Sequence, residues 1–242
     1  MTPGRLHTVG VGPGDPELLT LKAARLIAAA PVVAYFAKSG RAGHARTIAA
    51  AHVAAGAEEL RFEYPFTTEV PLEDPRYAAG IGAFYEDCAG MLRARLEAGR
   101  DVALLCEGDP FLYGSAMYLF DRIPPALRGE VVPGVSGMSG CWSRAQRPMT
   151  HGDDVLCVLP GTMATEALTA RLRGADAAVV MKVGRNLPRI RAALETAGLL
   201  DRALYVERGT MAGERILPLA ERDDAPAPYF SMVLVPGRQG AR

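Results

Sequence analysis

The chain contains few of the residues that build structural metal sites and disulfide-stabilised folds. It has four cysteines in 242 residues and no CxxC pair, and its four histidines are scattered without the spacing of metal ligands. Because structural zinc sites need closely spaced cysteine and histidine ligands, we expect no metal site. Cysteine usage of this kind is typical of a reducing compartment, so we expect a cytoplasmic protein.

The chain also lacks net charge and any apolar run long enough to cross a bilayer. Lys+Arg and Asp+Glu are equal at 27 each, so no overall field attracts nucleic acid or an anionic membrane. The longest apolar stretch, residues 26–37, is interrupted by Pro31 and is too short for a span. A turn at residues 12–14 comes before a signal-peptide core could form, so we expect none.

Apolar runs alternate with helical patterns along most of the chain, which predicts an α/β protein. Val102–Cys106 is continuously apolar, as in a strand buried on both faces of a parallel sheet. Strands are expected at 6–11, 32–36, 102–106, 129–132, 154–159, 177–183, 203–207 and 229–235. Helices are expected from about 18, near 45–55, and at about 77–98, 136–146, 163–173 and 187–197.

Two segments interrupt this alternation. Pro124-Pro125 is the most plausible hinge, which predicts one α/β domain at 1–124 and a second at 125–242. Residues 60–76 contain three prolines and read as an irregular loop. Long loops without structure of their own are often functional, so this segment is the candidate substrate lid.

The first glycine-rich strand end, residues 9–15, only superficially resembles a dinucleotide fingerprint. Its third glycine comes one residue early, and Pro13 removes an N–H that a pyrophosphate would need. No Gly-Lys-Ser/Thr follows, so a P-loop is excluded. What remains is a tight turn with close backbone approach, either functional or merely structural.

Two further strand ends combine small residues with polar ones. Residues 107–115 read EGDPFLYGS, where Asp109-Pro110 is a good N-cap and N1 pair for a following helix. The alternative is that Gly108 and Gly114 clear space beside a flat ligand. Residues 133–140 read PGVSGMSG and open a helix with glycines, a cost accepted when backbone packs closely on a neighbouring helix or a ligand.

A fourth pair of segments lies at later strand ends. Residues 181–185 read MKVGR, and residues 207–212 read ERGTMA. A methionine at a strand end is more often a core residue than a cofactor contact, so Met181 alone is a weak signal. In α/β proteins ligands bind at the carboxyl ends of strands, which is where all of these segments are expected.

Together these motifs resemble the tetrapyrrole methylase family. The matching segments, in the order and spacing of that family, are VGVGPGDPELLTLKAARLI, EGDPFLYGS, VVPGVSGMSG, VVMKVG and ERGTMAGERI. The resemblance covers nearly the whole chain. It implies two α/β domains of the non-Rossmann, class III type, with S-adenosylmethionine in the cleft between them, and a homodimer. By motif match, the residues implied to line the cofactor site are Pro13, Glu107, Gly108, Asp109, Leu112, Ser136, Gly137, Met181, Gly209, Thr210 and Ala212.

Within the family, residues 43–48 and 62–71, GHARTI and FEYPFTTEVP, resemble the branch that methylates C20 of precorrin-2 during corrin synthesis. The chain departs at Ser136-Gly137, where many relatives have Thr-Ala or Ser-Ala, so a side-chain methyl contact would be lost there. The alternatives are a cobalt-loaded substrate, another ring position, methylation of RNA or of a protein, and a non-catalytic module that binds S-adenosylmethionine or a tetrapyrrole. The absence of a basic stripe counts against RNA.

The implied chemistry asks for positioning more than for a reactive side chain. A sulfonium methyl is already electrophilic and a reduced tetrapyrrole is electron-rich, so alignment and exclusion of water are the main requirements. A proton must leave the methylated carbon, and the candidate general bases are Asp109 and Glu107. The many carboxylates of a tetrapyrrole predict cationic partners, although each cation could equally be a solvated surface charge. The candidates are Lys38, Arg41 and Arg46, then Arg144 beside Arg147, and Arg185 beside Lys182.

Overall fold

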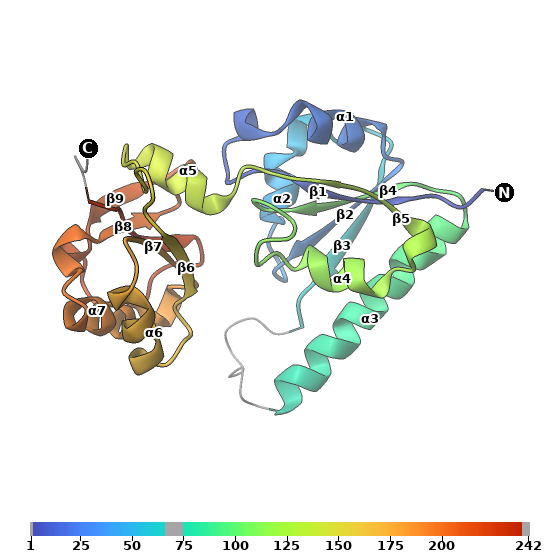
Figure 1. Cartoon of the computed structure of the whole chain (residues 1–242). Coiled ribbons are helices and arrows are strands. Elements are labelled where there is room, and N and C mark those ends of the chain that lie inside the picture. Colours follow the sequence, from blue (N-terminus) through green and yellow to red (C-terminus); the bar gives the residue numbers. More distant parts are fainter. Residues whose placement is uncertain (1, 66–74, 239–242) are drawn as a thin grey trace. The chain divides into compact units, whose positions relative to one another are not determined.

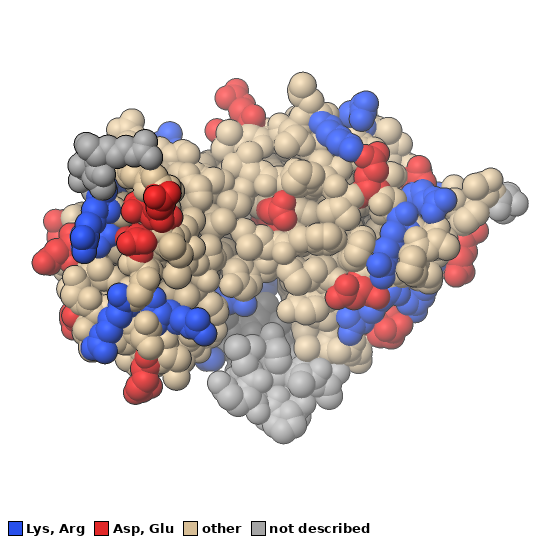
Figure 2. All heavy atoms as spheres, viewed as in Figure 1, with Lys and Arg blue, Asp and Glu red and all other residues tan. Residues whose placement is uncertain are grey.

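The computed structural model describes residues 2–65 and 75–238, which form two compact units, Met1–Gly137 and Met138–Arg242 (Figure 1). Each unit contains one five-stranded sheet. In the described part of the chain, no helix is long and apolar enough to cross a membrane. On the face drawn in Figure 2, basic and acidic side chains are interspersed on both units.

The first unit has a wholly parallel sheet with the strand order β3-β2-β4-β1-β5. Its strands are β1 Leu6–Gly10, β2 Val32–Ala37, β3 Glu58–Glu63, β4 Val102–Cys106 and β5 Arg128–Val132. Its helices are α1 Leu21–Ala29, α2 His44–Ile48, α3 Pro75–Glu97 and α4 Ala116–Arg122. The central strand β4 is buried along its whole length, as its continuous apolar run predicted.

Helices cover both faces of this sheet (Figure 1). On one face, α3 and α4 pack against alternate strand residues such as Leu104 and Phe62. On the other face, α1 and α2 pack against the intervening residues, among them Val33 and Leu105. Because successive strand residues point to opposite faces, a sheet buried on both sides needs apolar residues at every position.

The division between the units lies later than the boundary predicted after residue 124. The reason is that β5, at 128–132, pairs in parallel with β1 and so belongs to the first sheet. The proline pair at 124–125 instead precedes a short 3-10 helix, Pro125–Leu127, that leads into this strand.

The second unit has a mixed sheet with the order β6-β7-β10-β8-β9. Its strands are β6 Leu156–Pro160, β7 Ala177–Met181, β8 Leu204–Glu207, β9 Arg215–Pro218 and β10 Ser231–Val235. The helices are α5 Gly137–Arg144, α6 Thr165–Arg173 and α7 Leu187–Thr196. β6 and β7 are parallel, and β10 is antiparallel to both β7 and β8. The carboxyl ends of β6, β7 and β8 therefore lie at the same edge of the sheet.

The α/β class is confirmed, and each predicted strand is present with ends within two residues. Among the described strands and α-helices, β3, β9 and α4 were missed. Part of the predicted loop at 60–76 is strand, because Leu60 to Glu63 pair with β2. Residues 66–74, which carry most of the proposed lid, lie outside the described part of the chain.

Candidate cofactor site

Three of the glycine-rich segments meet at the carboxyl edge of the first sheet. Gly108, after β4, donates its N–H to the Gly12 carbonyl at 2.8 Å, and the Gly12 N–H returns a 3.4 Å bond to the Gly108 carbonyl. The third segment approaches at Gly134, after β5, where a Cβ would lie 2.0 Å from the Gly108 oxygen. The predicted close backbone approach is therefore confirmed, and it joins the three loops to one another.

The glycines of these loops serve backbone packing. A Cβ on Gly10 would lie 2.6 Å from the Gly134 nitrogen, a distance that real Cβ atoms do not adopt. Gly108 has a φ of +63°, which favours glycine for a separate reason. Gly114 does not clear space for a flat ligand, because its Cβ would meet the Cys106 sulfur at 2.5 Å.

Residues 11–13 of the first loop have no backbone N–H left for a ligand. The Val11 N–H bonds to the Cys106 carbonyl at 2.9 Å, the Gly12 N–H bonds to Gly108, and Pro13 has no N–H. A pyrophosphate needs several converging N–H groups, and these three residues supply none. The geometry fits a cofactor without phosphate, such as S-adenosylmethionine, better than a dinucleotide.

Asp109 links two of the three loops. Its Oδ1 accepts the Phe111 N–H at 2.9 Å, and its Oδ2 accepts the Gly134 N–H at 3.3 Å. The interpretation that Asp109 caps the next helix is wrong, because α4 begins only at Ala116 and has Ser115 at its N-cap position. Asp109 instead closes a local turn with Phe111, and α4 begins only after this turn.

Glu107 is held by a different element. Its Oε1 accepts the Ala45 N–H at 3.1 Å, in the first turn of α2. The N-cap residue of α2, Gly43, has no side chain to offer, so Glu107 supplies the missing acceptor from 62 residues away in sequence. This contact fixes α2 beside the carboxyl end of β4.

The remaining predicted cofactor residues of the first unit surround the same loops. Pro13 is buried and Leu112 is half-buried, and the Leu112 N–H donates to the Asp109 carbonyl at 3.3 Å. Ser136 and Gly137 approach Gly108 from the third loop, with the Gly137 nitrogen 3.3 Å from the position of a Gly108 Cβ. All seven residues predicted in this unit therefore lie on one connected set of loops.

In the second unit, strained backbone marks the carboxyl ends of β7 and β8. Lys182, just after β7, has a φ of +57°, while Arg208 and Thr210, just after β8, have φ values of +51° and +69°. Such values are costly for residues with a Cβ and cluster at functional sites. The segments 181–185 and 207–212 singled out from sequence therefore carry this strain.

The turn between β8 and β9 is fastened by one carboxylate. Glu214 Oε2 accepts the Thr210 N–H at 2.8 Å, and both Glu214 oxygens lie 2.9 Å from Nε of Arg144 on α5. The hydrogen bond from Arg144 is the main reason that the pKa of Glu214 lies below its usual range. Arg144, predicted to bind substrate, is therefore engaged in an ion pair. Glu214 was missed as a site residue, although its spacing of four residues from Thr210 fits a turn closed by a side chain.

Cys141, beside this turn, and the partly buried Met181, at the end of β7, contribute to one core cluster of the second unit. A Cβ on Gly209 would lie 2.7 Å from the sulfur of Cys141 on α5, so the turn packs directly on that helix. Burial raises the pKa of the Cys141 thiol to about 12, which makes it an inert packing group. Met181 packs against the same core cluster, as expected of a core methionine.

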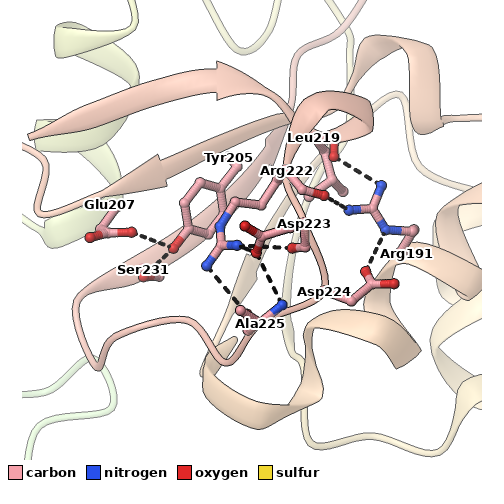
Figure 3. A network of polar contacts seen from close by, with 9 residues as sticks. All are labelled: Arg191, Tyr205, Glu207, Leu219, Arg222, Asp223, Asp224, Ala225 and Ser231. Atoms are coloured by element: carbon pink, nitrogen blue, oxygen red, sulfur yellow. Dashed lines mark hydrogen bonds and ion pairs between the residues drawn. The ribbon is translucent and has the colours of Figure 1, made fainter.

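A buried polar network anchors the end of β8 (Figure 3). The fully buried Tyr205 donates its hydroxyl to Glu207 at 2.8 Å and lies 3.1 Å from the Ser231 hydroxyl of β10. Arg222, only 6% exposed, places its guanidinium 5.1 Å from the centre of the Tyr205 ring. Its carbonyl accepts a hydrogen bond from Arg191 of α7. Glu207, the last residue before the strained turn, is thereby tied into the core.

The predicted substrate cations divide into two groups. Arg46 is committed to a bidentate pair with Glu59, at 2.8 and 3.0 Å, and Glu59 also accepts the Tyr35 hydroxyl at 2.8 Å. Arg46 therefore stabilises the first unit. Lys38, Arg41 and Arg185 are exposed, and Arg144 is also exposed but lies in the ion pair with Glu214. Among the described residues, no group of three or more His, Cys, Asp or Glu side chains could hold a metal ion.

Comparison with known proteins identifies the family. The family model for Tetrapyrrole (Corrin/Porphyrin) Methylases matches residues 5–223. A precorrin-2 C(20)-methyltransferase from Sinorhizobium sp is 53% identical over 234 residues, covering 97% of this chain and 96% of that protein. A cobalt-precorrin-2 C(20)-methyltransferase from Salmonella typhimurium is 31% identical and covers 96% of both chains.

Solved structures agree with this result. The cobalt precorrin-4 methyltransferase CbiF has a TM-score of 0.73 at 22% identity, covering 96% of this chain and 94% of that one, a similarity of fold. Uroporphyrin-III C-methyltransferase from Thermus thermophilus, complexed with S-adenyl homocysteine, has a TM-score of 0.64 at 26% identity, covering 96% and 97%. The family suggested by the five sequence motifs is confirmed: the chain belongs to the tetrapyrrole (corrin/porphyrin) methylases.

Proposed function

We propose that this methyltransferase transfers the methyl group of S-adenosylmethionine to C20 of precorrin-2, giving precorrin-3A in corrin synthesis. The observation that carries the proposal is the 53% identity, over nearly the full length of both chains, to an enzyme named for that reaction. The relative named for the cobalt-loaded substrate is only 31% identical over a similar length. The difference favours the metal-free tetrapyrrole as substrate.

The residues of the chain would contribute mainly by positioning. S-adenosylmethionine supplies an electrophilic methyl group when bound. The loops around Gly12, Gly108 and Gly134 present a backbone fixed by mutual contact, and the strained turn at Gly209–Ala212 presents a second fixed surface. Backbone that is already fixed orients a bound ligand without a further loss of conformational entropy. Correct orientation of the methyl donor is the main requirement of this reaction. Both surfaces are proposed to contact the cofactor.

Proton removal from C20 is proposed for Asp109. Glu107, the other candidate, has a carboxylate oxygen bonded to the Ala45 N–H and serves α2. Asp109 keeps Oδ1 in its local turn, whereas its Oδ2 bond to Gly134 is long at 3.3 Å. Oδ2 is therefore the oxygen proposed to accept the proton.

The carboxylates of the tetrapyrrole are proposed to meet exposed cations. Lys38 and Arg41 lie shortly after the carboxyl end of β2, and Arg185 lies shortly after that of β7. Each follows a strand end, where ligands of α/β proteins bind. We further propose that the protein is cytoplasmic and forms a homodimer. Light scattering of the purified protein would test the dimer.

The deciding experiment is a product analysis. The purified protein is incubated anaerobically with precorrin-2 and S-adenosylmethionine carrying a ¹³C-labelled methyl group. Mass spectrometry counts the added methyl groups, and NMR locates the labelled carbon. A single methyl at C20 supports the proposal. A methyl at another carbon, or transfer only to cobalt-loaded factor II, contradicts it.

A further inference from the structure

The turn between β8 and β9 holds a conformation that its residues disfavour. Arg208 and Thr210 have φ values of +51° and +69°, in the left-handed region that glycine adopts most easily. The penalty is greatest for a β-branched residue such as threonine. Such backbone persists only where the surroundings over-determine it. Some neighbouring group must therefore hold Thr210 in place.

Glu214 is one such group. Its carboxylate reaches back four residues to accept the Thr210 N–H at 2.8 Å, and its side chain is only 18% exposed. A half-buried carboxylate bonded to a backbone N–H is stabilised further when a cation faces it. Arg144 provides the cation, with Nε 2.9 Å from both Glu214 oxygens. The last residue of α5 is thereby connected through Glu214 to the amide of Thr210.

We propose that Glu214 and Arg144 are positioning residues that hold the Gly209–Ala212 turn in the geometry that binds S-adenosylmethionine. The inference rests on the proposed assignment of this turn to the cofactor. It gives Arg144 a role other than contact with the tetrapyrrole, and it gives Glu214 a role in ligand affinity. Removal of either side chain lets the strained turn relax, and the cofactor must then restore the turn when it binds.

The test is calorimetric titration of S-adenosylhomocysteine into the full-length protein and its variants. Glu214→Gln keeps the shape and one acceptor but loses the ion pair, and Arg144→Met removes the cation. Each is expected to weaken binding about fivefold, and the double variant no more than about tenfold, because both act through one contact. Arg144→Lys should recover part of the affinity. In turnover, the KM for S-adenosylmethionine should rise by a similar factor while kcat stays within about twofold.

The matched control is Asp224→Asn. Asp224 also pairs with an arginine of the second unit, but that arginine is Arg191 on α7, at 3.0 Å, and not Arg144. It should lose stability without loss of affinity for S-adenosylhomocysteine. Equal weakening by Asp224→Asn, or affinities within twofold of the unsubstituted protein for both Glu214→Gln and Arg144→Met, would overturn the inference. If Glu214→Gln fails to fold, Arg144→Met decides, since its side chain is 58% exposed.

The two proposals fail separately. Binding of S-adenosylhomocysteine requires no tetrapyrrole, so the affinities test the positioning pair even if precorrin-2 is not methylated. Failure to methylate precorrin-2, with the expected loss of affinity in the variants, contradicts the proposed substrate alone. Normal turnover with unchanged affinity in the variants contradicts the positioning role alone.

Discussion

Gly134 lies so close to Gly108 that a Cβ at residue 134 would be 2.0 Å from the Gly108 carbonyl oxygen. A Cβ at Gly10 would lie 2.7 Å from the same oxygen. The ends of β1, β4 and β5 therefore meet through backbone alone. Since a neighbour that is itself backbone cannot rotate away, neither position accepts a side chain without movement of a loop.

Gly134→Ala should therefore disturb both stability and cofactor affinity. Overpacking of this kind costs about 1–3 kcal/mol of unfolding free energy. The displaced loop should also weaken S-adenosylhomocysteine binding by about tenfold or more. Urea unfolding followed by circular dichroism measures the first effect, and calorimetry measures the second.

The matched substitution is Gly82→Ala in α3. A Cβ at Gly82 would meet nothing within 4 Å. Because alanine favours the helix over glycine, this variant should gain about 0.5–1 kcal/mol of stability and keep its affinity. A Gly134→Ala protein as stable and as tightly binding as Gly82→Ala would contradict the packing argument.

Arg185, which is exposed, and Arg46, which is held in an ion pair, should respond differently to charge reversal. Arg185→Glu is expected to raise the KM for the tetrapyrrole about tenfold and leave S-adenosylhomocysteine affinity unchanged, because a lost charged contact is worth about 1.5–3 kcal/mol at most. Arg46→Glu should instead lower stability, since it places two carboxylates together at Glu59. Steady-state kinetics and urea unfolding separate the two outcomes.

The control for Arg185→Glu is Arg171→Glu. Arg171 is exposed near the end of α6, after which the chain re-enters the sheet at the amino end of β7. The charge change is the same, but it lies at the opposite edge from the strand ends that carry the motifs. An equal rise in KM for both variants would indicate a general charge effect and exclude a specific role for Arg185.

Sequence predicted the strand framework well because buried parallel strands are continuously apolar. β3 was missed for the opposite reason: Glu58, Glu59, Arg61 and Glu63 interrupt its apolar residues, and only Leu60 and Phe62 are buried. β9 is an exposed edge strand with one charged residue in four positions, so its pattern is equally weak. Such strands are recognised from their neighbours, which a single sequence does not display.

The approach of the loops to one another was predicted, but the side-chain hydrogen bonds around them were not. The small residues of the motifs identified which loops approach one another. That Glu107 bonds α2, and that Glu214 bonds Thr210, depends on tertiary contacts and on a local turn without a repeating pattern. Arginines are the least predictable, because Arg46 and Arg144 look the same as Arg185 in sequence, yet the structure pairs Arg46 with Glu59 and Arg144 with Glu214.

The Arg46–Glu59 pair makes stability depend on pH. The hydrogen bond from Arg46 is the main reason that the pKa of Glu59 is lowered in the folded protein. A lowered folded-state pKa contributes stability above the unfolded pKa, about 4.3, that is lost as the pH falls through the folded pKa. Because Glu59 is about one third exposed, the contribution should not exceed about 1 kcal/mol.

Glu59→Gln should therefore flatten the decline in unfolding free energy between about pH 5 and pH 3. Arg46→Met should flatten it nearly as much, because it removes the main cause of the lowered pKa. Urea unfolding at several pH values measures both curves. Curves parallel to that of the unsubstituted protein would show that this pair does not contribute to the acid sensitivity.

Asp109→Asn tests the proposed proton acceptor. An amide can still accept the Phe111 N–H through its oxygen, so the local turn should survive. It cannot take a proton from C20, and kcat should fall about 100-fold or more while the KM for S-adenosylmethionine changes little.

The control is Asp101→Asn, at the amino end of β4, where Oδ1 accepts the Arg5 N–H at 2.7 Å. It removes the same charge from a comparable side-chain-to-backbone bond and should leave kcat within about twofold. If Asp109→Asn instead raises the KM and spares kcat, Asp109 acts through its bond to Gly134, and the proton leaves by another route.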